Sequence, residues 1–204
     1  SVSIGGGLLT KGNANLLLVH GTELQKEVFA RNEFSGRFSG TMALSEPQAG
    51  SSLSDITTRA TPDGTDFETD PLGPRYRIKG NKMWISAGEH ELTENIIHLV
   101  LAKIPGPDGK LIPGTRGISL FIVPKVKCDP AGNLGARNTV TCGSIEHKMG
   151  IRASATCVMN FDNAEGYLIG PPNKGLECMF TFMNSARVGT SARPPESRST
   201  VEYF

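Results

Sequence analysis

Two short segments contain the residues best suited to bind a ligand. In TMALSEPQAGSSLSDI (41–56), a short apolar run leads into Ser-Glu-Pro and then Ala-Gly-Ser. Gly50 lets the backbone approach a ligand closely, and Ser51 offers a hydroxyl and an N–H at that point. Taken alone, this segment indicates either a plain turn or a binding loop. In NKMWISAG (81–88), Trp84 stands in a strand-like sequence, where a lone tryptophan is typical of a core position.

Other searches for chemistry find little. The sequence has no GxxxxGK[S/T], no GxGxxG and no HExxH, because His90-Glu91 is followed by Leu-Thr-Glu. Gly5-Gly6-Gly7 is more typical of an ordinary loop than of a phosphate loop, and the four histidines are scattered. The cysteines contain no CxxC pair, so we expect free thiols and no metal site. They are Cys128, Cys142, Cys157 and Cys178.

The composition indicates a globular protein. Of the 204 residues, 38% are hydrophobic and 20% are charged, which disfavours disorder. A net charge of +1 gives no strong field to attract nucleic acid or an anionic membrane. No apolar run is long enough for a membrane-spanning helix, so we expect no membrane span.

Helices are expected towards both ends of the chain. Residues 8–35 are predicted to be helical with a break at Gly21, Thr22 has the features of an N-cap, and Gly36 ends the second part. A further helix is predicted after Gly170. The expected buried faces are Leu8, Leu9, Leu16, Leu17 and Val19, then Leu24, Val28 and Phe29, and finally Leu176, Met179, Phe180 and Met183.

Short strands are expected between the helices. Alternating apolar residues predict strands at 76–86, 95–103, 118–124 and 154–161. Cys157, Met159 and Phe161 share one side of the last strand, and Gly80-Asn81 is predicted to form a hairpin turn within the first. Frequent glycine and proline favour a barrel or sandwich, and no βαβ alternation is present.

Together, the two motif segments resemble the acyl-CoA dehydrogenase family. ALSEPQAGSS (43–52) matches the family signature small–aliphatic–Ser/Thr–Glu–x–x–small–Gly–Ser–Asp except at its end, and GNKMWIS (80–86) matches the following GxKxWI[S/T] strand. The likeness continues through GISLFIVPK, KMGIRASATCVMNFD and NKGLECMFTFMNSAR, and so extends over about residues 10–190. It is greatest for the larger bacterial-type branch that includes methylthiopropanoyl-CoA dehydrogenases.

The resemblance implies a mainly β fold, with a middle-domain β-barrel flanked by helical segments. Residues 1–37 would be the end of an N-terminal helical domain and 38–170 the barrel that binds FAD and acyl-CoA. Residues 171–190 would start a C-terminal helical domain, and 191–204 would form an irregular tail in which Pro194-Pro195 excludes helix. The chain starts at Ser1 without an initiator Met, and we expect it to be a fragment of a longer protein.

The resemblance also implies a flavin site. The implied FAD-binding residues are Leu44, Ser45, Gly50, Ser51, Trp84 and Ser86. Leu44 and Ser45 would lie along the pyrimidine edge of the flavin, Trp84 would stack on the isoalloxazine, and Ser86 would bond flavin N5. Ser51 would contact both the FAD pyrophosphate and the CoA chain.

Two further substrate contacts follow from the same resemblance. Asn184 and Arg187 would line the pantetheine path, and the alternative for Arg187 is a surface salt bridge. Ser52 stands where the family has Asp, and Asp55 stands where a small residue is usual, so the loop after Ser51 departs from the family pattern.

The implied activity is α,β-dehydrogenation of an acyl-CoA thioester, a reaction of fatty acid metabolism. A carboxylate removes the α proton while the β hydride passes to flavin N5. In the family this carboxylate belongs to a glutamate in the C-terminal bundle, which lies beyond this chain. We therefore nominate no catalytic residue. Glu46 is instead predicted to bond nearby backbone N–H groups, and the 204-residue chain alone is expected to be inactive.

Alternatives remain within and outside this enzyme class. One is an acyl-CoA oxidase of the same fold, and the other is a truncated, non-catalytic binding module. The resemblance implies an acyl-CoA substrate, an electron-transfer flavoprotein as acceptor and a homo-oligomer in the full-length protein, with no nucleic acid partner. We expect an intracellular location, either bacterial cytoplasm or mitochondrial matrix.

Overall fold

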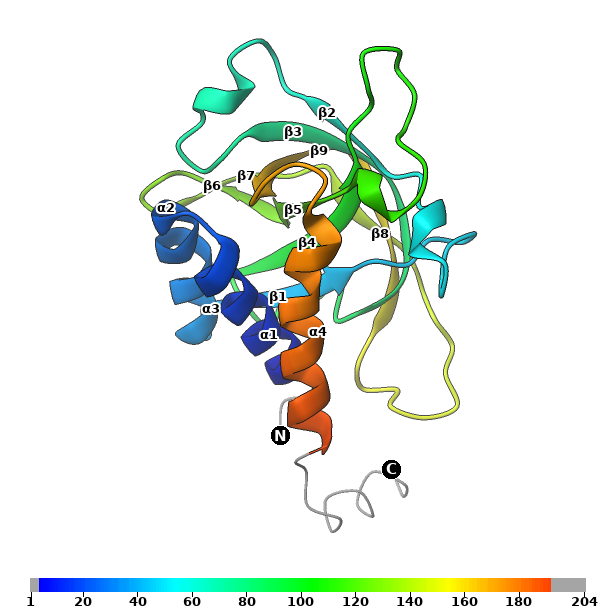
Figure 1. The fold of residues 1–204 in the computed structure, drawn as a ribbon. Coiled ribbons are helices and arrows are strands. Elements are labelled where there is room, and N and C mark those ends of the chain that lie inside the picture. The colour runs from blue at the N-terminus through cyan, green and yellow to red at the C-terminus, as the bar shows by residue number, and fades with distance from the viewer. Residues whose placement is uncertain (1–3, 192–204) are drawn as a thin grey trace.

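A closed ring of strands forms the centre of the protein (Figure 1). The computed structural model describes residues 4–191. In pairing order the ring runs through β4 (Asn95–Lys103), β2 (Arg59–Pro62), β3 (Arg75–Ser86), β9 (Thr156–Ile169) and β5 (Ile118–Pro124), which pairs again with β4. All of these pairings are antiparallel except that of β2 with β4, which consists of one residue pair, Arg59 with Lys103. The predicted mainly β fold is confirmed, and the strands close into a barrel.

The remaining strands extend this barrel. β1 (Phe38–Ala43) pairs in parallel with the first part of β4, and β8 (Val140–Ile145) pairs with the first part of β9. β6 (Val126–Cys128) and β7 (Leu134–Arg137) form a separate hairpin. Three short 3-10 turns lie in the connections, namely η2 (Leu53–Asp55), η3 (Phe67–Thr69) and η4 (Thr115–Gly117).

Strands β4 and β5 are buried on both faces, which explains their almost continuous apolar sequences. Leu99 and Leu101 of β4 belong to the apolar cluster shared with the helices, whereas Val100 and Ala102 belong to the cluster inside the barrel. Successive side chains of a strand point to opposite faces, so a strand between two cores has no solvent-facing positions. The predicted strand at 95–103 coincides with β4.

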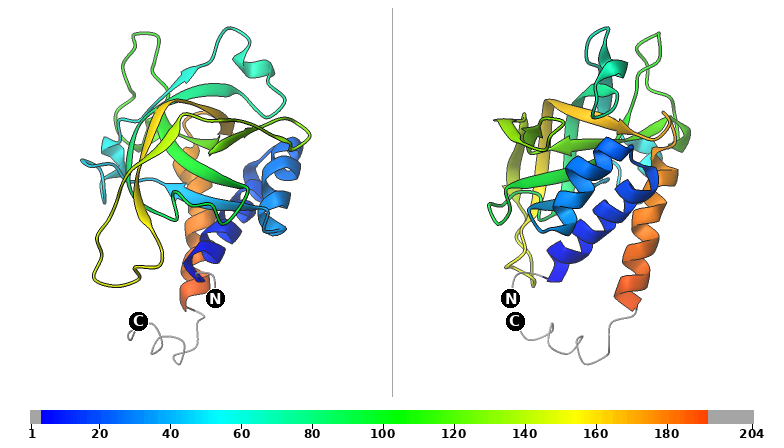
Figure 2. Two further views of the ribbon diagram at one scale, coloured as in Figure 1. Left: turned by 180° about the vertical axis from the view of Figure 1, so that it is seen from behind. Right: turned by 90° about the vertical axis from the view of Figure 1, so that its left-hand side faces the viewer.

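The helices pack against one side of the barrel (Figure 2). α1 (Ile4–His20) is followed by one continuous helical stretch made of α2 (Glu23–Gln25), the π-helical η1 (Lys26–Ala30) and α3 (Arg31–Phe34). α4 (Gly175–Ser191) lies beside α1, where His20 Nε2 and Thr181 Oγ1 are 2.8 Å apart. Among the described residues, no helix combines the length and apolar character needed to cross a membrane.

The predicted helix boundary at Thr22 is confirmed. The Gln25 backbone N–H donates to Thr22 Oγ1 over 3.2 Å, and the Thr22 N–H donates back to Gln25 Oε1 over 3.0 Å. This reciprocal capping box satisfies two N–H groups that would otherwise lack partners. At the other end, Gly36 adopts a φ of +78°, which an L side chain rarely tolerates, and the helix stops there.

Two helical residues that were expected to be buried are exposed, so this prediction is wrong for them. Val19 is 63% exposed and Phe180 is 44% exposed, whereas Phe182 is fully buried. The reason lies in the contact between α1 and α4. A Cβ on Gly12 would come within 3.0 Å of the Phe182 ring, so the missing side chain at Gly12 leaves the space that this ring fills.

The predicted hairpin turn at Gly80-Asn81 is also wrong, because β3 continues through both residues as one strand of 12 residues. Pairing with β9 on one side extends from Arg75 to Ser86 and continues the strand across the turn signal, with a register shift between Ile78 and Gly80. A Cβ at Gly80 would lie 2.3 Å from Thr58 Oγ1. The glycine therefore serves close packing within the strand.

Replacing Gly80 tests this packing. We expect Gly80→Val to lower the free energy of unfolding by about 1–3 kcal/mol, because the new side chain overlaps Thr58. Urea denaturation followed by circular dichroism measures the change. Gly150→Ala is the matched control, since nothing lies within 4 Å of its added Cβ. Equal stability of Gly80→Val and the wild type would contradict the close contact.

Candidate functional site

The two motif segments lie next to each other at one end of the barrel. β1 runs directly into Leu44 and Ser45, and the Met83 N–H of β3 donates a hydrogen bond to Ser45 O over 2.9 Å. The first segment is thus joined through backbone atoms to the strand that carries Trp84. The structure thus places Ser45 beside the strand segment that contains Trp84.

A bulge in β3 presents Trp84 to the outside. The pairing of β3 with β9 shifts register between Lys82 and Ile85, and Trp84 adopts a φ of +59° within this irregularity. Lys82 and Ile85 point inwards and are buried, whereas Trp84 is 52% exposed. Bulges re-aim side chains in this way next to binding sites. The exposure excludes the core position that a lone tryptophan in a strand suggests.

An ion pair in the interior fixes the two segments relative to each other. Lys82 Nζ lies 2.8 Å from Glu46 Oε1 and donates a second hydrogen bond to Leu44 O over 2.9 Å. The side chains of Lys82 and Glu46 are 0% and 2% exposed. Lys82 therefore binds the residues on both sides of Ser45, through the Leu44 carbonyl and the Glu46 carboxylate.

Glu46 also holds the chain that follows Ser51. Its carboxylate accepts hydrogen bonds from the Thr57 N–H at 2.7 Å and the Thr58 N–H at 3.1 Å, and from both threonine hydroxyls. The prediction that Glu46 bonds nearby backbone N–H groups is confirmed. Lys103 of β4 adds a bond of 2.7 Å to Ser54 O, so the middle and the end of the 50–58 loop are both held by hydrogen bonds.

The electrostatics keep this pair charged at neutral pH. Burial by itself would raise the pKa of Glu46, but the Lys82 charge and the hydrogen bonds from Lys82, Thr57 and Thr58 lower that pKa to about 2. Burial lowers the pKa of Lys82 to about 8, against the opposing effect of Glu46. With its carboxylate fully occupied and ionised, Glu46 is unsuited to accept a proton from a substrate.

The serines of the predicted flavin site leave their hydrogen-bonding capacity open. No described residue makes a hydrogen bond with the hydroxyls of Ser45, Ser51 or Ser86, and Ser51 and Ser86 are exposed. No atom lies within 4 Å of a Cβ built on Gly50, so the backbone there is open to close approach. An exposed aromatic face with unpartnered hydroxyls suits a planar cofactor with polar edges, and the residues present therefore fit FAD.

The loop that departs from the family pattern carries its own carboxylate contact. Ser52 Oγ donates to Asp55 Oδ2 over 2.8 Å, and Asp55 ends the short turn η2. Asp55 thus brings a carboxylate next to Ser52. Ser51 remains exposed before this contact.

Asn184 and Arg187 lie elsewhere, on α4. Both side chains are exposed, and Arg187 Nη1 lies 3.5 Å from Asn184 Oδ1. Their predicted role along the pantetheine path stays a prediction, as do the FAD contacts.

The sequence reasoning missed Lys82, Thr57 and Thr58. Lys82 lies within the quoted GNKMWIS motif, where a charged residue stands among the apolar residues of a predicted strand. The matching signal was Glu46, the one acid in the other motif. Two opposite charges in two segments that bind together are candidates for a buried pair.

We expect acid to destabilise the fold through Glu46. Because its folded pKa lies below the ordinary value of 4.5, the stabilisation is complete above that pH and is lost as pH falls towards about 2. Glu46→Gln should remove this part of the pH dependence. It should also lower stability at pH 7 by about 3–5 kcal/mol, because Lys82 is left buried and unpaired.

Denaturation at a series of pH values measures both effects. Glu27→Gln is the control, since it removes an exposed carboxylate whose partner Arg31 is also exposed, and a change below about 0.5 kcal/mol is expected. An unaltered acid limb in Glu46→Gln would refute the assignment.

Comparison with known proteins identifies relatives of this chain. A family profile described as acyl-CoA dehydrogenase, middle domain, matches residues 41–164. The 3-methylmercaptopropionyl-CoA dehydrogenase of Ruegeria pomeroyi is 48% identical over 183 residues, which cover 88% of this chain and 29% of that protein. A butyryl-CoA dehydrogenase of Syntrophomonas wolfei is 43% identical over 190 residues, covering 89% and 29%. The chain thus spans under a third of the length of these relatives.

Solved structures share the fold. Acyl-CoA dehydrogenase from Geobacillus kaustophilus has a TM-score of 0.69 at 26% identity and covers 92% of this chain, which covers 43% of it. Acyl-CoA dehydrogenase complexed with FAD from Bacillus anthracis has a TM-score of 0.64 at 25% identity, with coverages of 85% and 26%. The profile match over more than half of the chain and the identity to these relatives show that this chain belongs to the acyl-CoA dehydrogenase family.

Proposed function

We propose that this chain is the flavin-binding part of an FAD-dependent enzyme that oxidises acyl-CoA thioesters to their α,β-unsaturated products. The observation that carries the proposal is the exposed Trp84, held beside Ser45 by the buried Lys82–Glu46 pair. Membership of the family supports it, as do relatives named as dehydrogenases of acyl-CoA thioesters.

Six residues would hold FAD through three kinds of contact. Trp84 would stack on the isoalloxazine, an arrangement worth about 0.5–1.5 kcal/mol beyond the buried area. Leu44 and Ser45 would bind its pyrimidine edge and Ser86 its N5 atom, while Gly50 and Ser51 would admit the pyrophosphate. When bound, FAD supplies the acceptor for the hydride that leaves the β carbon.

The residues of this chain would orient the reactants rather than move the α proton. Ser51 would contact the CoA chain as well as FAD, and Asn184 and Arg187 would line the pantetheine. Glu46 is excluded as a base by its ion pair and its low pKa. We therefore assign the base to a part of the enzyme outside these residues.

An electron-transfer flavoprotein is our proposed acceptor, and a homo-oligomer our proposed assembly. The resemblance to the family is what supports this acceptor, and a structure of an electron transferring flavoprotein of Acidaminococcus fermentans is among the neighbours in fold, with a TM-score of 0.65. Oxygen consumption during turnover would instead favour an acyl-CoA oxidase.

Replacing Trp84 tests the flavin assignment. A complete enzyme containing these residues should purify yellow, and Trp84→Ala should retain less FAD because the stacking surface is lost. Absorbance after gel filtration measures the flavin content. Trp84→Phe keeps an aromatic face and should retain more FAD than Trp84→Ala. A colourless wild-type enzyme that takes up no added FAD would overturn the proposal.

The chain by itself tests where the base lies. Residues 1–204 should show no measurable acyl-CoA oxidation with an artificial electron acceptor and excess FAD, because loss of a general base alone reduces rates by roughly 10²–10⁴-fold. Extending the chain with the C-terminal bundle of a relative should restore activity. Robust turnover by residues 1–204 would show that a carboxylate within this chain acts as the base.

A further inference from the structure

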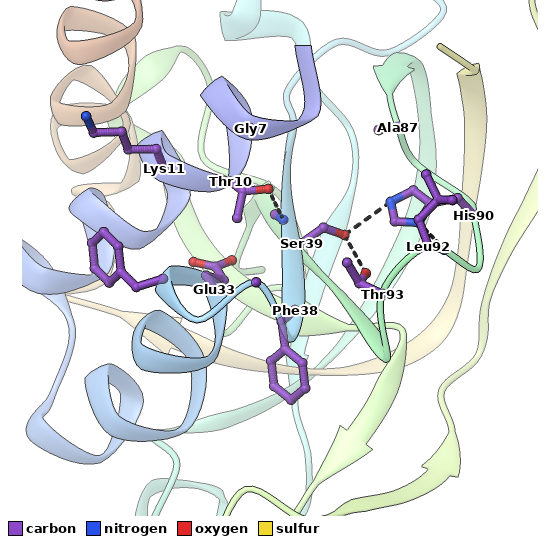
Figure 3. A pocket seen from close by; sticks show the side chains of 13 residues that line it. Gly7, Thr10, Lys11, Glu33, Phe38, Ser39, Ala87, His90, Leu92 and Thr93 are labelled. Atoms are coloured by element: carbon purple, nitrogen blue, oxygen red, sulfur yellow. Dashed lines mark hydrogen bonds between the residues drawn. The ribbon is translucent and has the colours of Figure 1, made fainter. Parts of the chain in front are cut away.

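A pocket of about 430 Å³ lies where the helices meet the barrel (Figure 3). Its walls are the start of α1, the end of α3, the start of β1 and the connection from β3 to β4. Phe34, Phe38 and Leu92 supply apolar surface to these walls, and the side chains of Phe34 and Leu92 are exposed. Apolar side chains gathered around an open hollow are typical of a surface that another group covers.

Polar groups on the barrel side of the pocket already satisfy one another. The Leu92 N–H donates to His90 Nδ1 over 3.2 Å, so a neutral His90 carries its proton on Nε2, which lies 3.1 Å from Ser39 Oγ. Ser39 then donates to Thr93 Oγ1 over 3.1 Å, and Thr93 donates to Asn95 O over 2.9 Å. This side of the pocket therefore does not require a polar occupant.

The carboxyl of Glu33 differs from these groups. Figure 3 shows it on the side of the pocket opposite His90 and Thr93. Glu33 is 4% exposed, and neither of its oxygens has a hydrogen-bond partner among the described residues. With these residues alone, burial raises the pKa of Glu33 well above its usual range. A buried carboxyl without a partner is costly in either protonation state, so a partner is expected in the complete protein.

The charged and titratable groups around the pocket do not supply this partner. Lys11 lines the pocket from α1, but Figure 3 shows its ammonium group directed away from Glu33. Arg37, which precedes β1, binds Glu94 instead, with Nε 2.7 Å from Oε2. His90 is engaged in the hydrogen bonds described above. Within the part of the chain that the structure describes, no cation therefore forms an ion pair with Glu33.

We infer that a basic side chain from a part of the complete enzyme outside these 204 residues enters the pocket and forms an ion pair with Glu33. The chain spans under a third of the length of its relatives, so most of such an enzyme lies outside these residues. A basic group is the complement of a buried carboxylate, because it neutralises the charge and satisfies the oxygens together.

The lining of the pocket suits an arginine best. Both oxygens of Glu33 are open, and a planar guanidinium can donate to two carboxylate oxygens at once. Phe34 also offers an aromatic ring on which a guanidinium can stack. The inference rests on membership of the family and on this geometry, and it does not depend on the proposed function.

Replacing Glu33 in the complete, FAD-loaded enzyme distinguishes an ion pair from an unpaired carboxyl. An ion pair holds the folded pKa below the ordinary 4.5, so its stabilisation is complete above that pH and is lost as pH falls. Glu33→Gln should therefore lower the melting temperature by about 2–4 °C at pH 7, and this difference should shrink as the pH falls below 4.5. An unpaired carboxyl has a raised pKa, so the wild type would instead lose stability relative to Glu33→Gln as pH rises.

Thermal unfolding at a series of pH values measures the effect. Glu27→Gln is the matched control, since it removes an exposed glutamate outside the pocket and should leave the melting temperature unchanged. A crystal structure of the complete enzyme should show a basic side chain within hydrogen-bond distance of Glu33. Replacing that residue by methionine should also lower the melting temperature at pH 7, and the two losses should not add in the double variant.

Four results would overturn the inference. They are no difference between Glu33→Gln and the wild type at any pH, a higher melting temperature of Glu33→Gln at pH 7, an uncharged group covering Glu33 in the crystal structure, and a basic residue from within residues 1–204 in the expected position. Lys11→Met tests the last of these directly, because it should leave the melting temperature unchanged if the partner comes from elsewhere. None of these measurements requires turnover of an acyl-CoA, so failure of the proposed function would be recognised separately.

Discussion

The position of the candidate site depends on one charge pair buried at the end of the barrel. Lys82 comes from a long strand and Glu46 from the turn after β1, two elements with no ladder between them at this point. Their contact, together with the bond from Lys82 to Leu44 O, fixes the turn against the strand. If either charge were missing, the other would remain in the interior without compensation, so the arrangement favours both or neither.

The same pair explains why polar and aromatic groups remain available on the surface above it. Glu46 takes up the N–H groups of Thr57 and Thr58, and Lys82 takes up the carbonyl of Leu44. Those backbone groups therefore do not compete for the hydroxyls of Ser45 or Ser86. The interior satisfies its own hydrogen bonds, and the bulge at Trp84 turns an aromatic face outwards instead of adding it to the core.

The sequence was informative where a local pattern and the tertiary packing coincide. The run at 95–103 became β4 because both of its faces are covered, and Thr22 became a cap because its bond to Gln25 spans three residues. The sequence was misleading where contacts between distant segments determine the structure. The Gly80-Asn81 signal is overridden by pairing with β9, and Phe182 is buried because Gly12 of another helix leaves room for it.

The candidate site, like the fold, could be predicted from the sequence only in part. The motif at 43–52 and the strand at 80–86 could be related to a flavin site by resemblance, and the structure places them side by side. The ion pair that joins them, the open carboxyl of Glu33 and the pocket next to it depend on residues from several separate elements. No spacing along the chain reveals such combinations, because the burial of each of these groups depends on elements that are distant in the sequence.

β9 also determines the order in which the barrel can assemble. This strand pairs with β3, β5 and β8, yet it comes after all of them along the chain. During synthesis from the N-terminus, the edges of β3 and β5 that await it stay open until residues 156–169 have been made. Open strand edges and long-range pairing slow folding and promote association between chains. A nascent chain that stalls before this strand would therefore expose these edges to pairing with other chains.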